Sequence, residues 1–302
     1  MSYHIRPSEH FTEEFKAVGA EQLTLAISTL TDRPQGLPEA IHDARKNFKR
    51  LRSLYRLAAA DIPAFRRSEN ARIRNMARTL STSHDATALV EVSRYLLDNA
   101  ENGDERAALK RISKVLIARR DERAADGGSQ LEETVATAIS TCGRALDALS
   151  RITFQDGGKE GAKRIAKGWR KALERAAAAR EACTDTTDSH LFHELRKRSQ
   201  DYRFYLDLLQ RLWPSAMHAK RVEVTKIVDL LGHHNDLALL ASLVDEQPHL
   251  FGKSEDVAYL LSAVITRQKV LREAALKIAS SVFRDDPEEE SRKIRLLWQD
   301  AV

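Results

Sequence analysis

The chain has few of the residues that build sheets, disulfide frameworks or membrane spans. Its 302 residues include two cysteines, Cys142 and Cys183, which are too few for a disulfide scaffold and form no C-x-x-C motif. Aromatic residues make up 6% of the chain, and no segment alternates between apolar and polar residues as a half-buried strand does. No run approaches the roughly 18 apolar residues of a membrane span, and the first six residues lack the apolar core of a signal peptide. We therefore expect a cytoplasmic protein without a membrane partner.

Charged residues, in contrast, are abundant. They make up 31% of the chain, and 49 Lys and Arg residues against 44 Asp and Glu residues give a net charge of +5. Together with 12 glycines and 7 prolines, this mixture is typical of long amphipathic helices. The sequence thus predicts an all-α protein. So small a net charge does not by itself indicate an anionic partner, and the distribution of the charges matters more.

One motif occurs twice. The segment 42–46, His-Asp-Ala-Arg-Lys, returns at 193–197 as His-Glu-Leu-Arg-Lys, an offset of 193 − 42 = 151 residues and half of the 302-residue chain. The same offset relates Arg52 to Arg203. A repeat of this size indicates a duplicated domain rather than a solenoid of short units.

The repeat and the helix breakers predict the organisation of the chain. We expect two halves, 1–151 and 152–302, and each is a bundle of about four long helices with short connections. Two prolines and a glycine within residues 31–38 separate a first helix from a basic helix that begins near Glu39. The glycine pair 157–158 lies close to the midpoint and is the expected link between the halves.

The basic helix of the first half has two chemically distinct faces. At about 100° per residue, its cations fall within roughly 80° of His42, whereas Phe48 and Leu51 lie on the opposite side. Charges of one sign on one face repel each other, so we favour a binding surface over an ordinary solvated face. Arginine binds phosphate oxygens with both arms of its guanidinium, and lysine adds a mobile charge. The predicted residues of this face are His42, Arg45, Lys46, Lys49, Arg52 and Arg56.

The second copy repeats this geometry with fewer charges. Gln200 stands where the first copy has Lys49, and Asp207 stands where it has Arg56. We therefore expect the first half to contribute more positive charge to a shared ligand. The predicted residues of the second face are His193, Arg196, Lys197 and Arg203.

Each basic helix is followed by a segment that ends in aspartate, Leu80–Asp85 and Leu231–Asp236. We expect turns here, with Asp85 and Asp236 as N-caps or ion-pair partners at the start of the next helix. His233 and His234 precede the second aspartate, but neighbouring histidines point to different sides of a helix. The sequence therefore predicts neither a metal site nor a cofactor.

These features resemble the CHAD domain, the conserved histidine α-helical domain, over nearly the whole chain. The resemblance rests on His-x-x-Arg-Lys in both halves, each followed after 43 residues by the aspartate of Leu-Gly/Ser-x-x-x-Asp. It implies two four-helix bundles related by pseudo-twofold symmetry, with basic residues of both halves lining a central channel or groove that binds inorganic polyphosphate. Some members of the family lie at polyphosphate granules. Beyond the two basic faces, the weaker candidates on other basic segments are Arg119, Arg120, Lys167, Arg170, Arg267 and Arg272.

The sequence lacks the motifs of an enzyme that cleaves phosphoanhydrides. It has no G-x-x-x-x-G-K-[ST] loop and no acidic pair with metal spacing. Relatives often carry a fused CYTH triphosphatase, but its Glu-x-Glu-x-Lys signature is absent from this chain. We expect a non-catalytic protein that binds polyphosphate, with other polyanions as further candidate ligands. The alternatives are binding of a nucleic-acid backbone and hydrolysis of polyphosphate or triphosphate.

Overall fold

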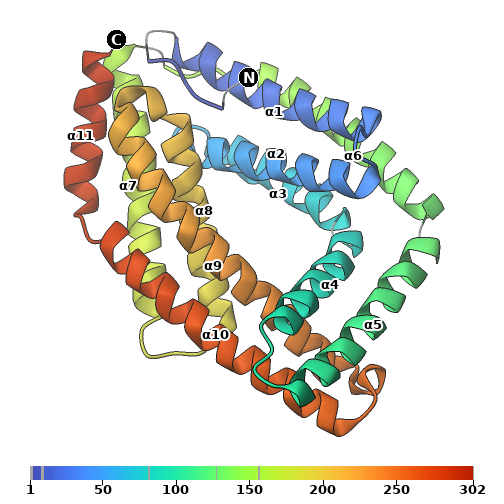
Figure 1. Cartoon of the computed structure of the whole chain (residues 1–302). Coiled ribbons are helices and arrows are strands. Elements are labelled where there is room, and N and C mark those ends of the chain that lie inside the picture. The colour runs from blue at the N-terminus through green and yellow to red at the C-terminus, as the bar shows by residue number, and fades with distance from the viewer. Residues whose placement is uncertain (1–2, 8–9, 81, 127, 156, 302) are drawn as a thin grey trace.

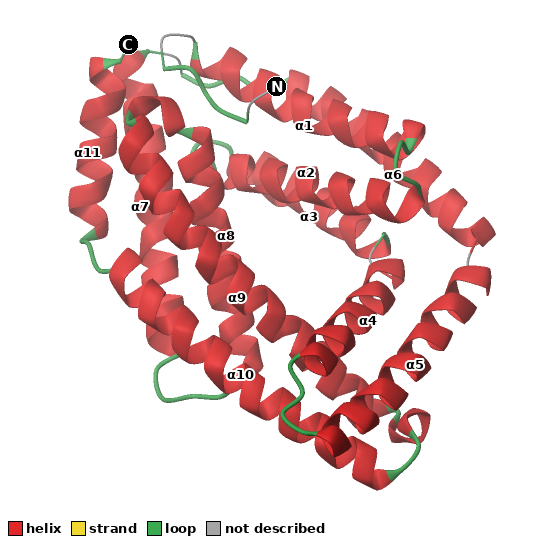
Figure 2. Cartoon of the chain, viewed as in Figure 1, coloured by secondary structure: helices red, strands yellow, loops and turns green. Residues whose placement is uncertain are grey.

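The computed structural model describes residues 3–7, 10–80, 82–126, 128–155 and 157–301, and the regular secondary structure of this part of the chain is helical, with loops between the helices (Figure 2). No strand occurs in the described residues, which confirms the all-α class. None of the described helices is both long and apolar enough to cross a bilayer. The α-helices are α1 (Phe11–Asp32), α2 (Leu37–Leu57), α3 (Pro63–Thr79), α4 (Thr82–Asp98), α5 (Gly103–Asp126), α6 (Gly128–Ser150), α7 (Gly158–Ala182), α8 (Ser189–Leu208), α9 (Pro214–Glu246), α10 (Ser254–Val282) and α11 (Pro287–Asp300), with short 3-10 helices η1 (Gln210–Leu212) and η2 (Pro248–Phe251).

Proline opens helices at matching places in the two halves. Pro63 is the first residue of α3, and Pro214, 151 residues later, is the first residue of α9. Proline suits this position because its fixed φ is already helical and its missing N–H has no partner in the first turn. The basic helix α2 begins in the same way, with Pro38 in its first turn. The predicted break before the basic helix is therefore confirmed.

The predicted turn at Leu231–Asp236 is wrong. Helix α9 runs without interruption from Pro214 to Glu246, so Asp236 lies inside a helix and not at its start. Leu231, Leu237 and Leu240 are all buried, and their packing outweighs the roughly 1 kcal/mol that a glycine costs within a helix. In the first half, α3 ends at Thr79 and α4 begins at Thr82, and the side chain of Asp85 lies outside the described residues.

Two hydrophobic cores hold the helices together. The larger core takes residues from α1, α2, α3, α6, α7, α8 and α11, from the first part of α9 and from the last part of α10. The smaller core joins α4 and α5 to the other ends of α9 and α10. Figure 1 shows α9 and α10 running side by side from the larger group of helices to α4 and α5. The pseudo-twofold relation and the boundary at residue 151 stay predictions.

Helix α2 lies against both α7 and α8. The end of α2 approaches α7 closely at Gly168, where an added Cβ would lie 2.3 Å from the carbonyl oxygen of Leu57. Real Cβ atoms do not come so close to a backbone atom, so α7 and the end of α2 can pack at this distance only with glycine at position 168.

We predict that Gly168→Ala lowers the free energy of unfolding by about 1–3 kcal/mol, because the added methyl group separates α2 from α7. The matched control is Gly143→Ala in α6, where an added Cβ meets no atom within 4 Å. That change raises stability by up to about 1 kcal/mol through helix propensity. Urea unfolding followed by circular dichroism measures both, and a Gly168→Ala protein as stable as the control contradicts the prediction.

Candidate functional site

The two basic helices bury the faces that the sequence predicts to be apolar. In α2, Ala44, Phe48 and Leu51 are at most 1% exposed, and in α8, Leu195 and Leu206 are fully buried. The cationic faces therefore turn away from the core. Because α2 and α8 also contact each other, their cations can share one surface.

The surroundings of Lys49 show that the cations of the two helices lie together. Burial is the main cause that lowers the pKa of this half-buried lysine from 10.5 to about 8. The positive charges of Arg196, Arg45, Arg203 and Arg52 lower it further, in that order. Two of these arginines belong to α8 and two to α2. Five of the predicted residues, from both halves of the chain, therefore form one cationic cluster around Lys49, which we call the α2–α8 cluster.

Helix α3 adds arginines that are not among the predicted residues. The pKa of Arg52 is lowered to about 10, first by burial and then by nearby arginines that include Arg74 and Arg66 of α3. The Arg52 Nε atom donates a hydrogen bond of 2.8 Å to the Asn70 side-chain oxygen, also on α3. The signal for these residues was present, because α3 directly follows the basic helix and is itself rich in arginine.

Carboxylates of α8 and α9 partly neutralise the α8 side of the cluster. Burial lowers the pKa of Arg196, and Asp236 and Asp229 oppose that shift. Burial likewise lowers the pKa of Arg203, against the opposing charges of Asp207 and Asp229. No carboxylate is among the groups that shift the pKa of Lys49. On the α2 side, Asp201 likewise opposes the lowering of the Arg52 pKa, so a larger contribution of the first half stays a prediction.

The remaining motif residues lie at the margins. His42 and Lys46 are exposed on α2, and Lys197 is exposed on α8. Lys197 donates a hydrogen bond of 2.7 Å to Glu194. The pKa of His193 is lowered, first by burial and then by the charge of Lys197, so it is protonated at lower pH than an exposed histidine.

Several other predicted cations bind acidic or amide groups of the protein. These contacts hold each side chain at its own place and reduce the charge that it offers to a ligand. Arg56 of α2 pairs with Asp201 of α8, Arg119 donates to Gln247 over 2.8 Å, Arg120 pairs with its neighbour Asp121 at 2.6 Å, and Arg170 pairs with Glu174 and Glu288, both at 2.8 Å.

Three further predicted residues lie on other elements. Arg267 of α10 lies over the ring of Tyr95, 4.9 Å from its centroid, and Arg272 lies 5.7 Å from the centroid of Phe192. Lys167 is exposed on α7 and lines a cleft between α7 and α11. None of these three residues is among the groups that lower the pKa of Lys49.

The histidine pair of α9 points in two directions, as neighbouring helical residues do. His233 is exposed and stacks on Tyr95, whereas His234 is buried against Phe192. Burial, followed by the charge of Arg272, lowers the pKa of His234 to about 4. Within the described residues, no three His, Cys, Asp or Glu side chains form a group that could hold a metal ion.

We predict that Lys49→Met raises the free energy of unfolding at pH 7 by about 1–3 kcal/mol, since each pKa unit corresponds to about 1.4 kcal/mol. Unfolded lysine titrates near 10.4 and folded Lys49 near 8. The unfolded state therefore holds more protons between these pH values, and wild-type stability rises with pH across that window. The difference in unfolding free energy between Lys49→Met and the wild type therefore becomes small as the pH approaches about 10.

Urea unfolding at several pH values measures this effect. Lys46→Met is the matched control, because Lys46 is exposed on the same helix, and we expect its stability to change by less than about 0.5 kcal/mol. A Lys49→Met advantage that does not depend on pH argues against charge as its cause.

Comparison with known proteins supports the family assignment. A family model described as the CHAD domain matches residues 21–245, which is more than half of the chain. The crystal structure of the CHAD domain from the plant Ricinus communis is similar with a TM-score of 0.64 and 19% sequence identity, over 94% of this chain and 95% of that chain. No curated protein matches the chain. At this identity the structural likeness shows the fold alone, whereas the family model shows that the chain belongs to the CHAD domain family.

Proposed function

We propose that this CHAD protein binds inorganic polyphosphate at the α2–α8 cluster without converting it chemically. The observation that carries the proposal is the position of Lys49, which is half-buried and lies close to two arginines of α2, Arg45 and Arg52, and to two arginines of α8, Arg196 and Arg203. The free protein holds these charges together against their mutual repulsion. A ligand with many negative charges relieves that repulsion, and inorganic polyphosphate is the polyanion that membership of this family implies.

The binding mechanism is electrostatic. The arginines of the cluster can each bind two phosphate oxygens, and Lys49 is charged below its pKa of about 8. A linear polyanion exchanges the loosely held counterions of these groups for its own phosphates. By analogy with nucleic acids, affinity then falls steeply with salt, and it rises with chain length as more phosphates engage.

The residues divide into a centre and a margin. At the centre, the half-buried cations fix the position of the ligand, because their side chains are held by packing. At the margin, exposed side chains can follow a chain that leaves the centre. In cells, the same binding predicts association with polyphosphate granules. The central residues are Arg45, Lys49, Arg52, Arg196 and Arg203, and the marginal residues are His42, Lys46, His193 and Lys197.

We predict that the paired charge reversal Arg45→Glu and Arg196→Glu weakens binding of long-chain polyphosphate at least about 30-fold, or about 2 kcal/mol. The slope of log affinity against log salt also falls by about two, one for each lost phosphate contact. Titration onto immobilised polyphosphate at three salt concentrations measures both effects.

The matched control makes the same change in net charge away from the cluster. Arg106 of α5 and Arg284, before α11, are both exposed, and Arg106→Glu with Arg284→Glu is expected to change affinity less than about threefold. Equal losses in the two double variants mean that only net charge matters, and the proposed site is then wrong.

Two assays separate this function from its alternatives. We predict that transfer RNA or single-stranded DNA, at equal phosphate concentration, fails to displace bound long-chain polyphosphate. We also predict that pure protein releases no phosphate from polyphosphate or triphosphate above background, with or without Mg²⁺. Displacement by nucleic acid contradicts the preferred ligand, and phosphate release that is lost in the Arg45→Glu and Arg196→Glu variant shows an enzyme.

A further inference from the structure

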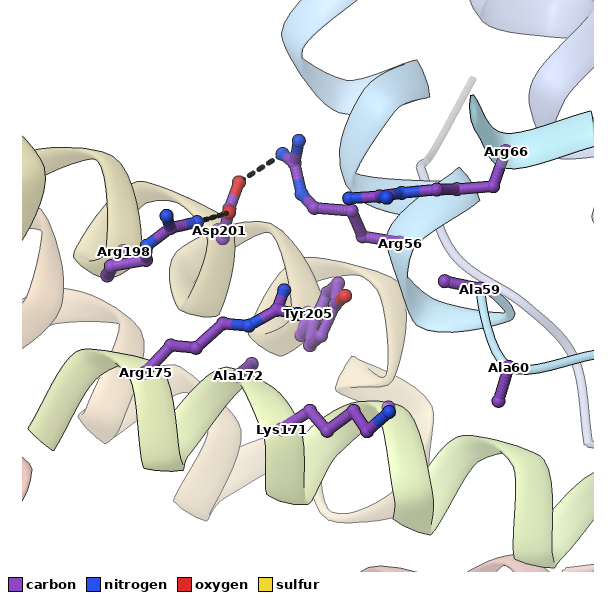
Figure 3. A pocket seen from close by; sticks show the side chains of 11 residues that line it. Arg56, Ala59, Ala60, Arg66, Lys171, Ala172, Arg175, Arg198, Asp201 and Tyr205 are labelled. Carbon is purple, nitrogen blue, oxygen red and sulfur yellow. Dashed lines mark hydrogen bonds and ion pairs between the residues drawn. The ribbon is translucent and has the colours of Figure 1, made fainter. Parts of the chain in front are cut away.

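A second cationic site lies where four helices meet. The end of α2, the start of α3, and helices α7 and α8 enclose a pocket of about 190 Å³ (Figure 3). Each of the four helices contributes at least one cation to its lining. These cations are Arg56 of α2, Arg66 of α3, Lys171 and Arg175 of α7, and Arg198 of α8.

The pocket holds more positive charge than its carboxylate can neutralise. Asp201 is the one acidic residue in its lining, and it pairs with Arg56 and, at 3.8 Å, with Arg198. Within the described part of the chain, no carboxylate lies within 4 Å of the other three cations, Arg66, Lys171 and Arg175. Three positive charges therefore remain uncompensated in a small volume.

Unused hydrogen-bond donors accompany these charges. The Nε atoms of Arg56 and Arg66 are buried and have no acceptor among the described residues. An N–H group left without an acceptor in the interior is unfavourable by about 1–3 kcal/mol. Figure 3 shows the side chain of Arg66 extending toward Arg56, and that of Arg175 extending toward Tyr205.

Tyr205 lines the same pocket. Its side chain is 2% exposed, and burial raises the pKa of its hydroxyl despite the opposing positive charges of Arg56, Arg175 and Arg66. The hydroxyl therefore keeps its proton at neutral pH although arginines surround it. A protonated hydroxyl among guanidinium groups can donate to an anion that these groups hold.

The size and position of the pocket define its ligand. A volume of about 190 Å³ is below the roughly 300–1,000 Å³ of sites for larger organic ligands. Arg198 and Tyr205 also lie on a different face of α8 from Arg196 and Arg203, because two helical residues turn the chain by about 200°. The pocket is thus small and rich in guanidinium groups, and it adjoins the α2–α8 cluster, because the charges of Arg56 and Arg66 also act on Arg52.

We propose that this pocket is a binding site for a small, multiply charged phosphate anion, orthophosphate or pyrophosphate. The guanidinium forks match the oxygens of a tetrahedral phosphate, Lys171 adds a mobile charge at the entrance, and the hydroxyl of Tyr205 donates from the interior. This site does not depend on the function proposed for the α2–α8 cluster.

Isothermal titration calorimetry of the full chain, in a phosphate-free chloride buffer, tests the proposal with orthophosphate and pyrophosphate as ligands. We expect one saturable site in the wild type and at least about tenfold weaker binding for Arg66→Gln with Arg175→Gln. Lys171→Gln, at an exposed position, and Tyr205→Phe each weaken small-anion binding about threefold to fivefold.

Two double variants serve as matched controls. Arg106→Gln with Arg284→Gln removes the same charge elsewhere, and Lys49→Gln with Arg203→Gln removes it from the α2–α8 cluster. Both are expected to bind the small anions as the wild type does. If neither anion binds the wild type, or if the cluster variant loses binding as strongly as the pocket variants, the proposal is wrong.

A third titration, with long-chain polyphosphate, distinguishes a separate site from an extension of the first one. We expect Arg66→Gln with Arg175→Gln to bind long chains within about threefold of the wild type. The inference is wrong if this variant loses long-chain binding strongly and the wild type binds neither small anion. The pocket is then part of the path that the polyphosphate chain follows. Small-anion binding in a protein that fails to bind long chains leaves the pocket valid and removes only the function proposed for the α2–α8 cluster.

Discussion

The repulsion between like charges at the contact of α2 and α8 is the constraint on which the rest of the structure depends. Lys49 is surrounded by arginines of both helices, and the ion pair between Arg56 of α2 and Asp201 of α8 offsets only part of this repulsion. The apolar faces supply the opposing force. Phe48 and Tyr55 of α2 and Tyr202 and Phe204 of α8 are all at most 2% exposed and belong to the larger core. Burial of a large aromatic side chain stabilises a fold by about 1.5–3 kcal/mol, so four of them can outweigh several repulsive contacts.

A buried carboxylate secures the back of α8. Glu290 of α11 accepts hydrogen bonds from Trp169 Nε1 at 3.2 Å and from the Tyr202 hydroxyl at 3.3 Å, and it also pairs with Lys220 of α9. Helices α7, α8, α9 and α11 thus converge on one side chain. A buried charge is tolerated only when its acceptor atoms are satisfied, and here the bonds that satisfy it also fix the helix that carries Arg196 and Arg203.

The sequence was informative where a feature depends on one helix and uninformative where it depends on several. Helical periodicity predicted which sides of α2 and α8 are buried, because the pattern is local, and the repeat predicted that their cations form a pair of matching faces. It did not reveal that Arg56 pairs with Asp201, because 145 residues separate them. It placed a turn before Asp236 because a glycine and polar residues interrupt the apolar pattern, whereas tertiary packing keeps α9 helical there. The pocket on the far side of α8 needs four helices to form, and no single segment shows it.

The two longest helices have a consequence for cooperativity. Helices α9 and α10 contain 33 and 29 residues, or about 50 and 44 Å at 1.5 Å per residue, and each contributes one end to the larger core and the other end to the smaller core. Continuous helices transmit order along their length, because each turn is bonded to the next. Loss of the smaller core therefore frays two helices that the larger core also needs, so the two cores gain and lose their structure together.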